Sequence, residues 1–164
     1  MTRLSPYRSL APEQRVALVS HAVQTSREAR ALYIQRLMAR KGGGFRVTTF
    51  QSWPADRLAR EVVRSRAETG EDELELLHLL YVQLEPQIQV TFLDEAGVAH
   101  ERGVMAEELS APYVDAAAVQ RAATAVRTQH GEDGMRYLRT LARYSAAGWP
   151  GIDSVVREFD AAPG

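Results

Sequence analysis

Apolar residues recur along most of this chain at spacings of three and four, the period of an amphipathic α-helix. The clearest stripe consists of Leu74, Leu77, Tyr81 and Leu84. Proline and glycine interrupt the pattern at points that suit the starts and ends of helices. We therefore expect an all-α fold in which residues 1–164 form a single-domain bundle of about six helices with short connections.

The first 41 residues are expected to form an N-terminal helical arm. Pro12 stands where the first turn of a helix tolerates proline, and Thr25-Ser26-Arg27-Glu28 has the spacing of a capping box that begins a second helix. One continuous helix over 12–40 fits the pattern equally well. Three consecutive glycines at 42–44 end the arm and predict a hinge.

Two segments have strand character and leave an alternative fold open. Residues 45–50 are rich in β-branched and aromatic side chains and are expected to be extended. After Pro86, apolar and polar residues alternate as far as Phe92, and residues 94–97 would then form a hairpin turn. The competing interpretation, which we favour, continues as a helix capped by Gly97. The runner-up fold is α+β, with a small sheet from 45–50 and 87–104.

A weak resemblance also bears on this second segment. The resemblance rests on Phe92-Leu93-Asp94, Gly97-Val98, His100-Glu101 and Gly103-Val104. With these residues, the stretch Gln87–Met105 resembles a segment that recurs in helical bacterial proteins. It covers about a tenth of the chain. The resemblance implies a helical fold and carries no activity with it.

The C-terminal third shows local helix signals. Asp115 is expected to cap one helix, and His130-Gly131 is expected to end it. The run Gly148-Trp149-Pro150-Gly151 should separate the next helix from a short final one. Trp149, like Trp53 earlier in the chain, is expected to be a core anchor beside a chain reversal because its ring buries a large apolar area.

Composition excludes several kinds of site. The chain has no cysteine, which excludes disulfides, thiolate metal sites and cysteine nucleophiles. Hydrophobic residues make up 45% and charged residues 25%, a globular rather than a disordered balance. No apolar run has the length of a membrane span, and the N-terminal residues lack the apolar stretch of a signal peptide. We therefore expect a cytoplasmic protein that does not enter a membrane.

Motifs for catalysis are equally scarce. The four histidines form no helical pair at i and i+4, and no Gly-x-Ser-x-Gly elbow occurs. Lys41 precedes the glycines at 42–44, whereas a phosphate loop needs lysine after them. We predict no catalytic residue, no cofactor and no metal site, and the sequence favours a protein that is not an enzyme. One loop, residues 100–108, holds His100 with Glu101, Glu107 and Glu108 and is kept as a weak candidate for a divalent ion.

Charge is distributed unevenly. Residues 1–68 contain 13 Lys and Arg against 5 Asp and Glu, and residues 69–164 contain 7 against 16. A basic first half is typical of a polyanion-binding surface, but the two halves could instead pack together and neutralise each other. The aromatic residues Phe45, Phe50 and Trp53 lie among the basic ones and would stack on bases if exposed. The candidate polyanion surface comprises Arg36, Arg40, Lys41, Arg46, Arg57, Arg60 and Arg64. The same arginines could alternatively dock on the acidic stretch at 71–75.

Three functions remain open on this evidence. The first is a non-enzymatic, bacterial-type helical module that binds a protein partner or another copy of itself through Tyr33, Leu37 and Met38 on the N-terminal arm. The second is a nucleic-acid-associated protein that uses the arginine-rich first half. The third is a metal-dependent protein centred on His100. We expect the first of these.

Overall fold

The computed structural model describes residues 5–41, 46–105 and 114–162. Within these ranges the chain is helical apart from one two-stranded hairpin, so the predicted all-α fold is confirmed. The contacts within the chain gather into two compact units, Met1–Leu76 and Leu77–Gly164, and each is described by itself. The assignment of 1–164 to a single domain stays a prediction.

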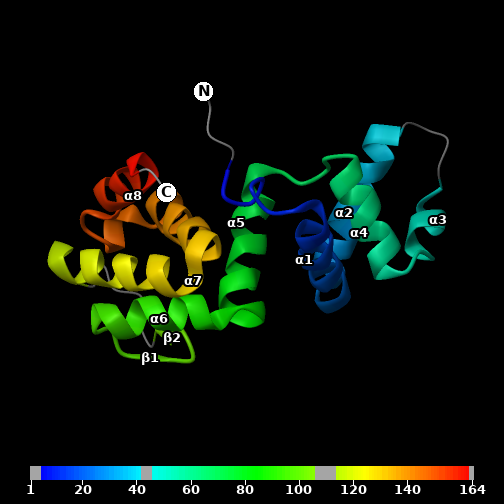
Figure 1. Cartoon of the computed structure of the whole chain (residues 1–164). Helices are drawn as coiled ribbons and strands as arrows, with labels where there is room; N and C mark the ends of the chain where they lie inside the picture. The colour runs from blue at the N-terminus through cyan, green and yellow to red at the C-terminus, as the bar shows by residue number, and fades with distance from the viewer. Residues whose placement is uncertain (1–4, 42–45, 106–113, 163–164) are drawn as a thin grey trace. The chain divides into compact units, whose positions relative to one another are not determined.

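The first unit is built from α1, α2, α3 and α4 (Figure 1). Helix α1 packs against α2 and α4, and α2 also contacts α3 and α4. These four helices are α1 (Pro12–Thr25), α2 (Arg27–Lys41), α3 (Val47–Gln51) and α4 (Ala55–Arg64). The N-terminal arm is therefore part of the unit's packing and does not stand apart from it. The predicted hinge at 42–44 lies outside the described residues.

Helices α1 and α2 are separate, which decides between the two interpretations of residues 12–40. The side-chain hydroxyl of Ser26 accepts a hydrogen bond from the backbone N–H of Ala29 at 3.1 Å. This bond satisfies one of the unpaired donors at the start of α2. The predicted restart is correct, but the capping residue is Ser26 and not Thr25.

The extended segment expected at 45–50 is wrong for the residues described, because 47–51 form helix α3. Phe50 is completely buried, and its ring meets that of Trp53 edge-on with 4.8 Å between centroids. A single helical turn also pairs backbone groups within the segment, for example Ser52 N–H with the carbonyl of Thr48 at 3.2 Å. A lone strand would have left these groups without partners, so helix is favoured despite β-branched residues.

Helix α5 (Gly70–Leu79) is capped at its start by a side chain. The carboxylate of Asp72 accepts a hydrogen bond from the backbone N–H of Thr69 at 2.7 Å, at the N-terminus of the helix. Helix α4 turns four apolar side chains inward. Leu58, Ala59, Val62 and Val63 are all buried.

The apolar stripe predicted from Leu74 to Leu84 is only half correct. Its two inner members are buried, but Leu74 and Leu84 are 43% and 41% exposed. Leu76 and Leu80 are buried in addition. The helix widens into a π-helical turn, η1 (Leu80–Leu84), which breaks the three-and-four spacing and turns the end of the stripe outward.

The second unit contains α6 (Pro86–Ala96), α7 (Ala116–Tyr144) and α8 (Ile152–Ala161), with a short 3₁₀ turn, η2 (Ala146–Gly148), before α8. Helices α6 and α8 both pack on α7 (Figure 1). Its core holds a chain of edge-to-face aromatic contacts in which Phe92 lies 5.7 Å from Tyr137 and 5.0 Å from Trp149 between ring centroids. Trp149 is thus the core anchor that the sequence predicts.

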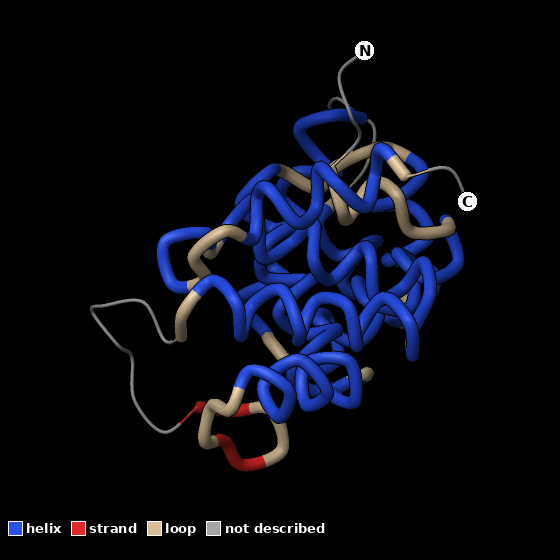
Figure 2. Tube along the Cα trace, turned by 60° about the vertical axis from the view of Figure 1, so that its left-hand side comes forward, coloured by secondary structure: helices blue, strands red, loops and turns tan. Residues whose placement is uncertain are grey.

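Residues 87–104 combine parts of both predicted forms. The favoured helix is confirmed as far as Ala96, and Gly97 caps it with a left-handed φ of 75°. A hairpin follows, but beyond the predicted turn at 94–97: β1 (His100–Glu101) pairs antiparallel with β2 (Val104–Met105) (Figure 2). Arg102 and Gly103 both have positive φ, as the two-residue hairpin turn requires. The runner-up α+β fold is wrong, since residues 47–50 take no part in a sheet.

The remaining helix signals of the second unit are confirmed. Asp115 caps α7, its carboxylate accepting a hydrogen bond from Ala118 N–H at 2.8 Å. Gly131 adopts φ 56° and ψ −129°, which interrupts α7 at the predicted stop. Glycine takes this left-handed conformation without the steric cost of a side chain.

Candidate functional site

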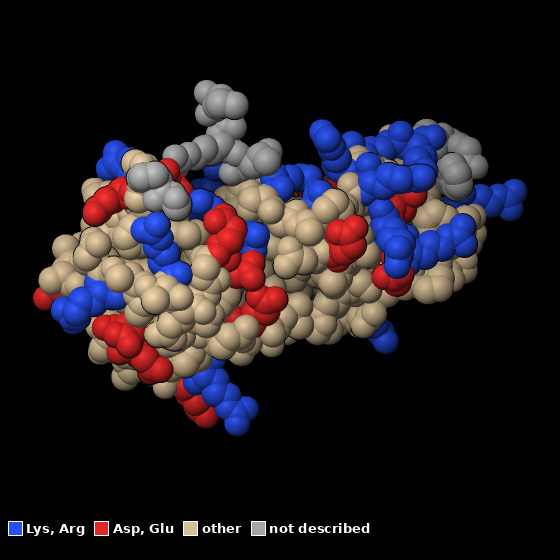
Figure 3. Space-filling view, viewed as in Figure 1, with Lys and Arg blue, Asp and Glu red and all other residues tan. Residues whose placement is uncertain are grey.

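Helix α4 presents a row of arginines on its exposed face. Arg57, Arg60 and Arg64 are separated by three and four residues, which places them along one side of the helix. Figure 3 shows Lys and Arg side chains gathered over this part of the first unit. The three arginines lie in the wall of a cleft with a volume of about 440 Å³. The complete lining is Lys41, Trp53, Asp56, Arg57, Arg60, Glu61 and Arg64.

One wall of this cleft is a stacked pair of flat side chains. The guanidinium carbon of Arg57 lies 4.2 Å from the ring centroid of Trp53, in cation–π geometry. The indole is held from the side by the buried ring of Phe50. Arg30 fixes the turn beneath it by donating to the carbonyl oxygen of Trp53 at 2.6 Å. Trp53 is therefore only partly buried, and the prediction that it is a core anchor is wrong: it forms a cleft wall.

Glu61 is a carboxylate of the cleft lining that three neighbouring side chains hold in place. Lys41 Nζ lies 2.8 Å from one carboxylate oxygen, to which Ser65 donates at 2.9 Å, and Arg64 donates to the other oxygen at 2.6 Å. Burial by itself would raise the pKa of Glu61, but the hydrogen bonds from Lys41, Arg64 and Ser65 lower it to about 2. Glu61 therefore stays ionised and holds the end of α2 to α4.

Positive charge prevails in the cleft. Its lining has four cationic side chains against two carboxylates, Asp56 and Glu61. Asp56 pairs with Arg60 at 2.9 Å, but both side chains are mostly exposed, so water screens the pair. Within the described part of the chain, no ion pair engages Arg57, and its guanidinium lies over the indole ring of Trp53.

The other predicted polyanion residues have different places. Arg36 forms an ion pair with the buried carboxylate of Asp72, and Arg40 donates to the carbonyl oxygen of Ser65 at 2.8 Å. These two arginines join α2 to the segments around α4 and α5, so their role is structural. Arg46 is exposed and directly precedes α3. The structure thus brings Lys41, Arg57, Arg60 and Arg64 together and leaves the other three predicted residues outside the cleft.

Part of the acidic stretch is buried against arginine, as the alternative interpretation of the charge pattern expected. Arg8 Nε donates to Glu73 at 2.6 Å, and the hydroxyl of Tyr7 donates to the buried carboxylate of Glu68 at 2.9 Å. Burial, followed by the charge of Glu68, raises the pKa of Tyr7 well above its usual range. Together with the pair between Arg36 and Asp72, these contacts form a buried polar network within the first unit. Its charges pair with one another within the fold.

The predicted partner surface on α2 is largely internal. Tyr33 is 3% exposed and Leu37 is 0% exposed, so neither side chain is available to a partner. The expectation that all three residues are exposed to a partner is wrong because α2 packs against α1, α3 and α4.

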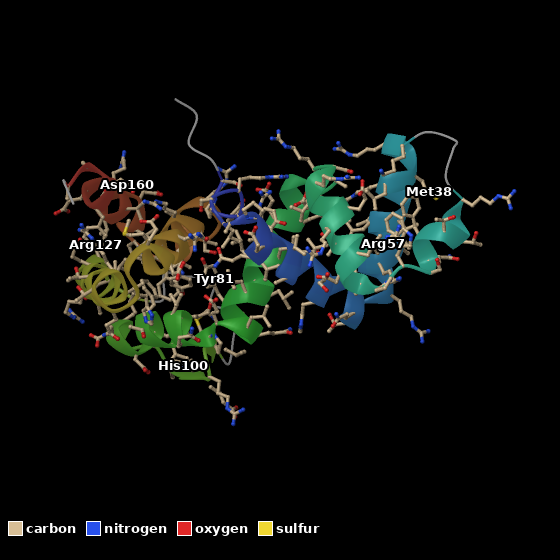
Figure 4. All side chains as sticks on the ribbon, turned by 45° about the vertical axis from the view of Figure 1, so that its right-hand side comes forward. Met38, Arg57, Tyr81, His100, Arg127 and Asp160 are labelled. Atoms are coloured by element: carbon tan, nitrogen blue, oxygen red, sulfur yellow. The ribbon has the colours of Figure 1, made fainter. Side chains whose placement is uncertain are left out.

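Met38 is partly exposed and, together with Ile34, lies in a groove of about 330 Å³. The lining of this α2–α3 groove is Ala31, Ile34, Gln35, Met38, Val47 and Gln51. Figure 4 labels Met38 on α2 and Arg57 on α4.

His100 is engaged on both ring nitrogens. Its Nδ1 accepts a hydrogen bond from the backbone N–H of Gly103 at 3.0 Å, so Nε2 carries the proton that faces Asp94 at 2.9 Å. A metal ligand needs a ring nitrogen with an available lone pair, and this arrangement leaves none. The candidate ion-binding loop also includes Glu107 and Glu108, which lie outside the described residues. Among the residues that are described, no group of three or more His, Asp or Glu could hold a metal ion.

Comparison with known proteins identifies no family for the chain. No family model matches it, and no curated protein or solved structure is significantly similar to it. Over the described ranges, none of the helices combines the length and apolar character needed to cross a bilayer. The fold and the site together define an all-α protein with an arginine-lined cleft on α4.

Proposed function

We propose that this is a non-enzymatic cytoplasmic binding protein whose first unit holds an anionic partner in the α4 cleft. The observation that carries the proposal is the convergence of Arg57, Arg60, Arg64 and Lys41 on one concave site. Guanidinium groups bind carboxylates and phosphates through two parallel hydrogen bonds. Their grouping in a cleft also concentrates positive potential, which attracts anions.

The distribution of charge in the first unit supports this proposal. Residues 1–76 contain 13 Lys and Arg against 9 Asp and Glu, an excess of four positive charges. Three of the acidic residues, Glu68, Asp72 and Glu73, are buried. Among the described residues of this unit, seven arginines are exposed against five carboxylates, and three of the seven arginines lie on the α4 face.

The proposal is tested by removing the three arginines together. The triple variant Arg57→Gln, Arg60→Gln, Arg64→Gln should leave a heparin column at much lower salt than the unaltered protein, because it contacts fewer anionic groups. The matched control changes three exposed arginines of the second unit: Arg102→Gln, Arg121→Gln, Arg157→Gln. It carries the same net charge as the test variant and should elute close to the unaltered protein. Equal elution of the two triple variants would remove the proposal.

The α2–α3 groove supports a second candidate function, self-association. Its lining is apolar apart from Gln35 and Gln51, and Val47 is 41% exposed. Exposed apolar surface of this kind is covered in many proteins by a second copy of the chain. Light scattering should then show a dimer that Met38→Glu converts to a monomer. A monomer at every concentration of the unaltered protein would exclude this function and leave the anion-binding proposal untouched.

A further inference from the structure

We infer that the anionic partner is a single-stranded nucleic acid, with a base stacked on the Arg57–Trp53 pair and the phosphates held by the remaining cations of the cleft. This inference rests on the proposed function and assigns a chemical class to the partner of that same site. Its physical basis is the combination, in one cleft, of a flat cationic platform and a row of phosphate-binding groups.

The platform is Arg57 lying on Trp53. The 4.2 Å separation places the guanidinium against the indole face, and Arg57 is exposed, so its outer face is open to solvent. Nucleobases stack on aromatic rings and on guanidinium planes, and such stacking accepts any base. Because Phe50 and Arg30 hold the indole in place, little ordering is needed when a base arrives.

The cations that follow along α4 suit a repeating polyanion. From Arg57 to Arg64 the helix rises about 10 Å, so the row of cations is long enough to contact more than one phosphate of a strand. Arg60 and Arg64 are mostly exposed, at 72% and 73% of their side-chain surfaces. Arg60 can leave Asp56 at little cost because water screens that pair, and Arg64 has further N–H donors for a phosphate while it stays bound to Glu61. A strand whose base stacks on Arg57 would place its next phosphates along this row.

Two other anionic partners use the cleft less completely. An acidic peptide supplies carboxylates for the arginines but has no planar base for the platform. A nucleic-acid duplex keeps its bases within the stack, so only its phosphates would contact the cleft. A single strand satisfies both the row of cations and the stacked pair, and for this reason we favour it.

The experiment uses the full chain with Trp149→Phe, which leaves Trp53 as its one tryptophan, and follows the fluorescence of that residue. The probes are an oligo(dT) of about twelve nucleotides, the corresponding duplex, and inorganic polyphosphate of similar charge. We expect oligo(dT) to quench Trp53 and to bind at least tenfold more tightly than polyphosphate. In that chain Arg57→Lys, which keeps the charge but removes the plane, should weaken oligo(dT) binding about tenfold and polyphosphate binding much less.

The possible results separate this inference from the proposed function. Equal affinity for oligo(dT) and polyphosphate, or tighter binding of the duplex, would overturn the single-strand inference while the anion-binding function stands. Binding of none of the three probes would overturn both. Because position 57 is exposed and Arg57→Lys retains the charge, an effect much larger on oligo(dT) than on polyphosphate cannot arise from loss of folding.

Discussion

Glu61 makes the stability of the first unit depend on pH in a way that can be calculated. Its pKa falls from an ordinary 4.5 to about 2 on folding, and its side chain is 11% exposed, so screening by water is limited. At 1.36 kcal/mol per pKa unit, the ionised carboxylate stabilises the fold by about 3 kcal/mol. Because the folded pKa is the lower one, this stabilisation is complete above pH 4.5 and is lost as pH falls towards 2. About 2 kcal/mol of it is gone at pH 3.

The perturbation is Glu61→Gln, which keeps the shape of the side chain but removes its charge. Urea unfolding is followed by fluorescence in the Trp149→Phe chain, so that Trp53 reports on the first unit. At pH 6 the Gln variant should be less stable by about 3 kcal/mol, and at pH 3 the difference should shrink to about 1 kcal/mol. A difference that stays constant between these pH values would refute the reasoning, since Glu61 would then titrate no differently in the folded chain.

Three further predictions concern packing and helix ends, and each is measured by urea unfolding. Phe50→Ala should cost about 3–5 kcal/mol because it empties a fully buried site, and a cost below 1 kcal/mol would contradict the packing of α3. Gly134→Ala should cost about 1–3 kcal/mol, since its new methyl group would lie 2.5 Å from the carbonyl oxygen of Val126; an unchanged stability would show that α7 bends there freely. Asp115→Ala should cost about 1 kcal/mol through loss of the cap on Ala118, and no loss would mean that the cap is not formed in solution.

The parts of the fold that could be predicted are those fixed by local chemistry. Asp115 caps α7, and Gly97 ends α6 with a positive φ. The helix expected to continue through Pro86 instead ends before it, and Pro86 begins α6. Each of these signals acts within a few residues, through a backbone donor that needs a partner or a conformation that few residues adopt. These local signals mark where helices begin and end.

The parts that could not be predicted depend on contacts between distant residues. Val47 and its neighbours have the composition of a strand, but no partner strand exists for them among the described residues, and burial of Phe50 favours a helical turn. The π-helical turn η1 displaces Leu84 to the surface, and no local signal announces such a turn. Tyr33 and Leu37 form a regular apolar stripe whether they face the core or a partner. Only the packing of α2 decides between the two.

In the candidate site, too, the local features could be predicted and the contacts between distant residues could not. The spacing of Arg57, Arg60 and Arg64 predicts one exposed face, and the structure agrees. That Lys41 and Trp53 complete the cleft follows from the packing of α2 and the turn before α4, which the sequence does not reveal. The two carboxylates of the cleft were missed, although each stands three or four residues before an arginine that it pairs with.

The most direct test of the account is the salt dependence of oligo(dT) binding, compared between the unaltered protein and the triple variant of Arg57, Arg60 and Arg64. Each phosphate contact of a single strand contributes about 0.7 to the slope of log affinity against log salt concentration. Arg60 and Arg64 contact phosphates while Arg57 stacks on a base, so the three substitutions should reduce that slope by about 1.4, while the control triple variant of the second unit keeps it. Identical slopes for the unaltered protein and the cleft variant would contradict the account.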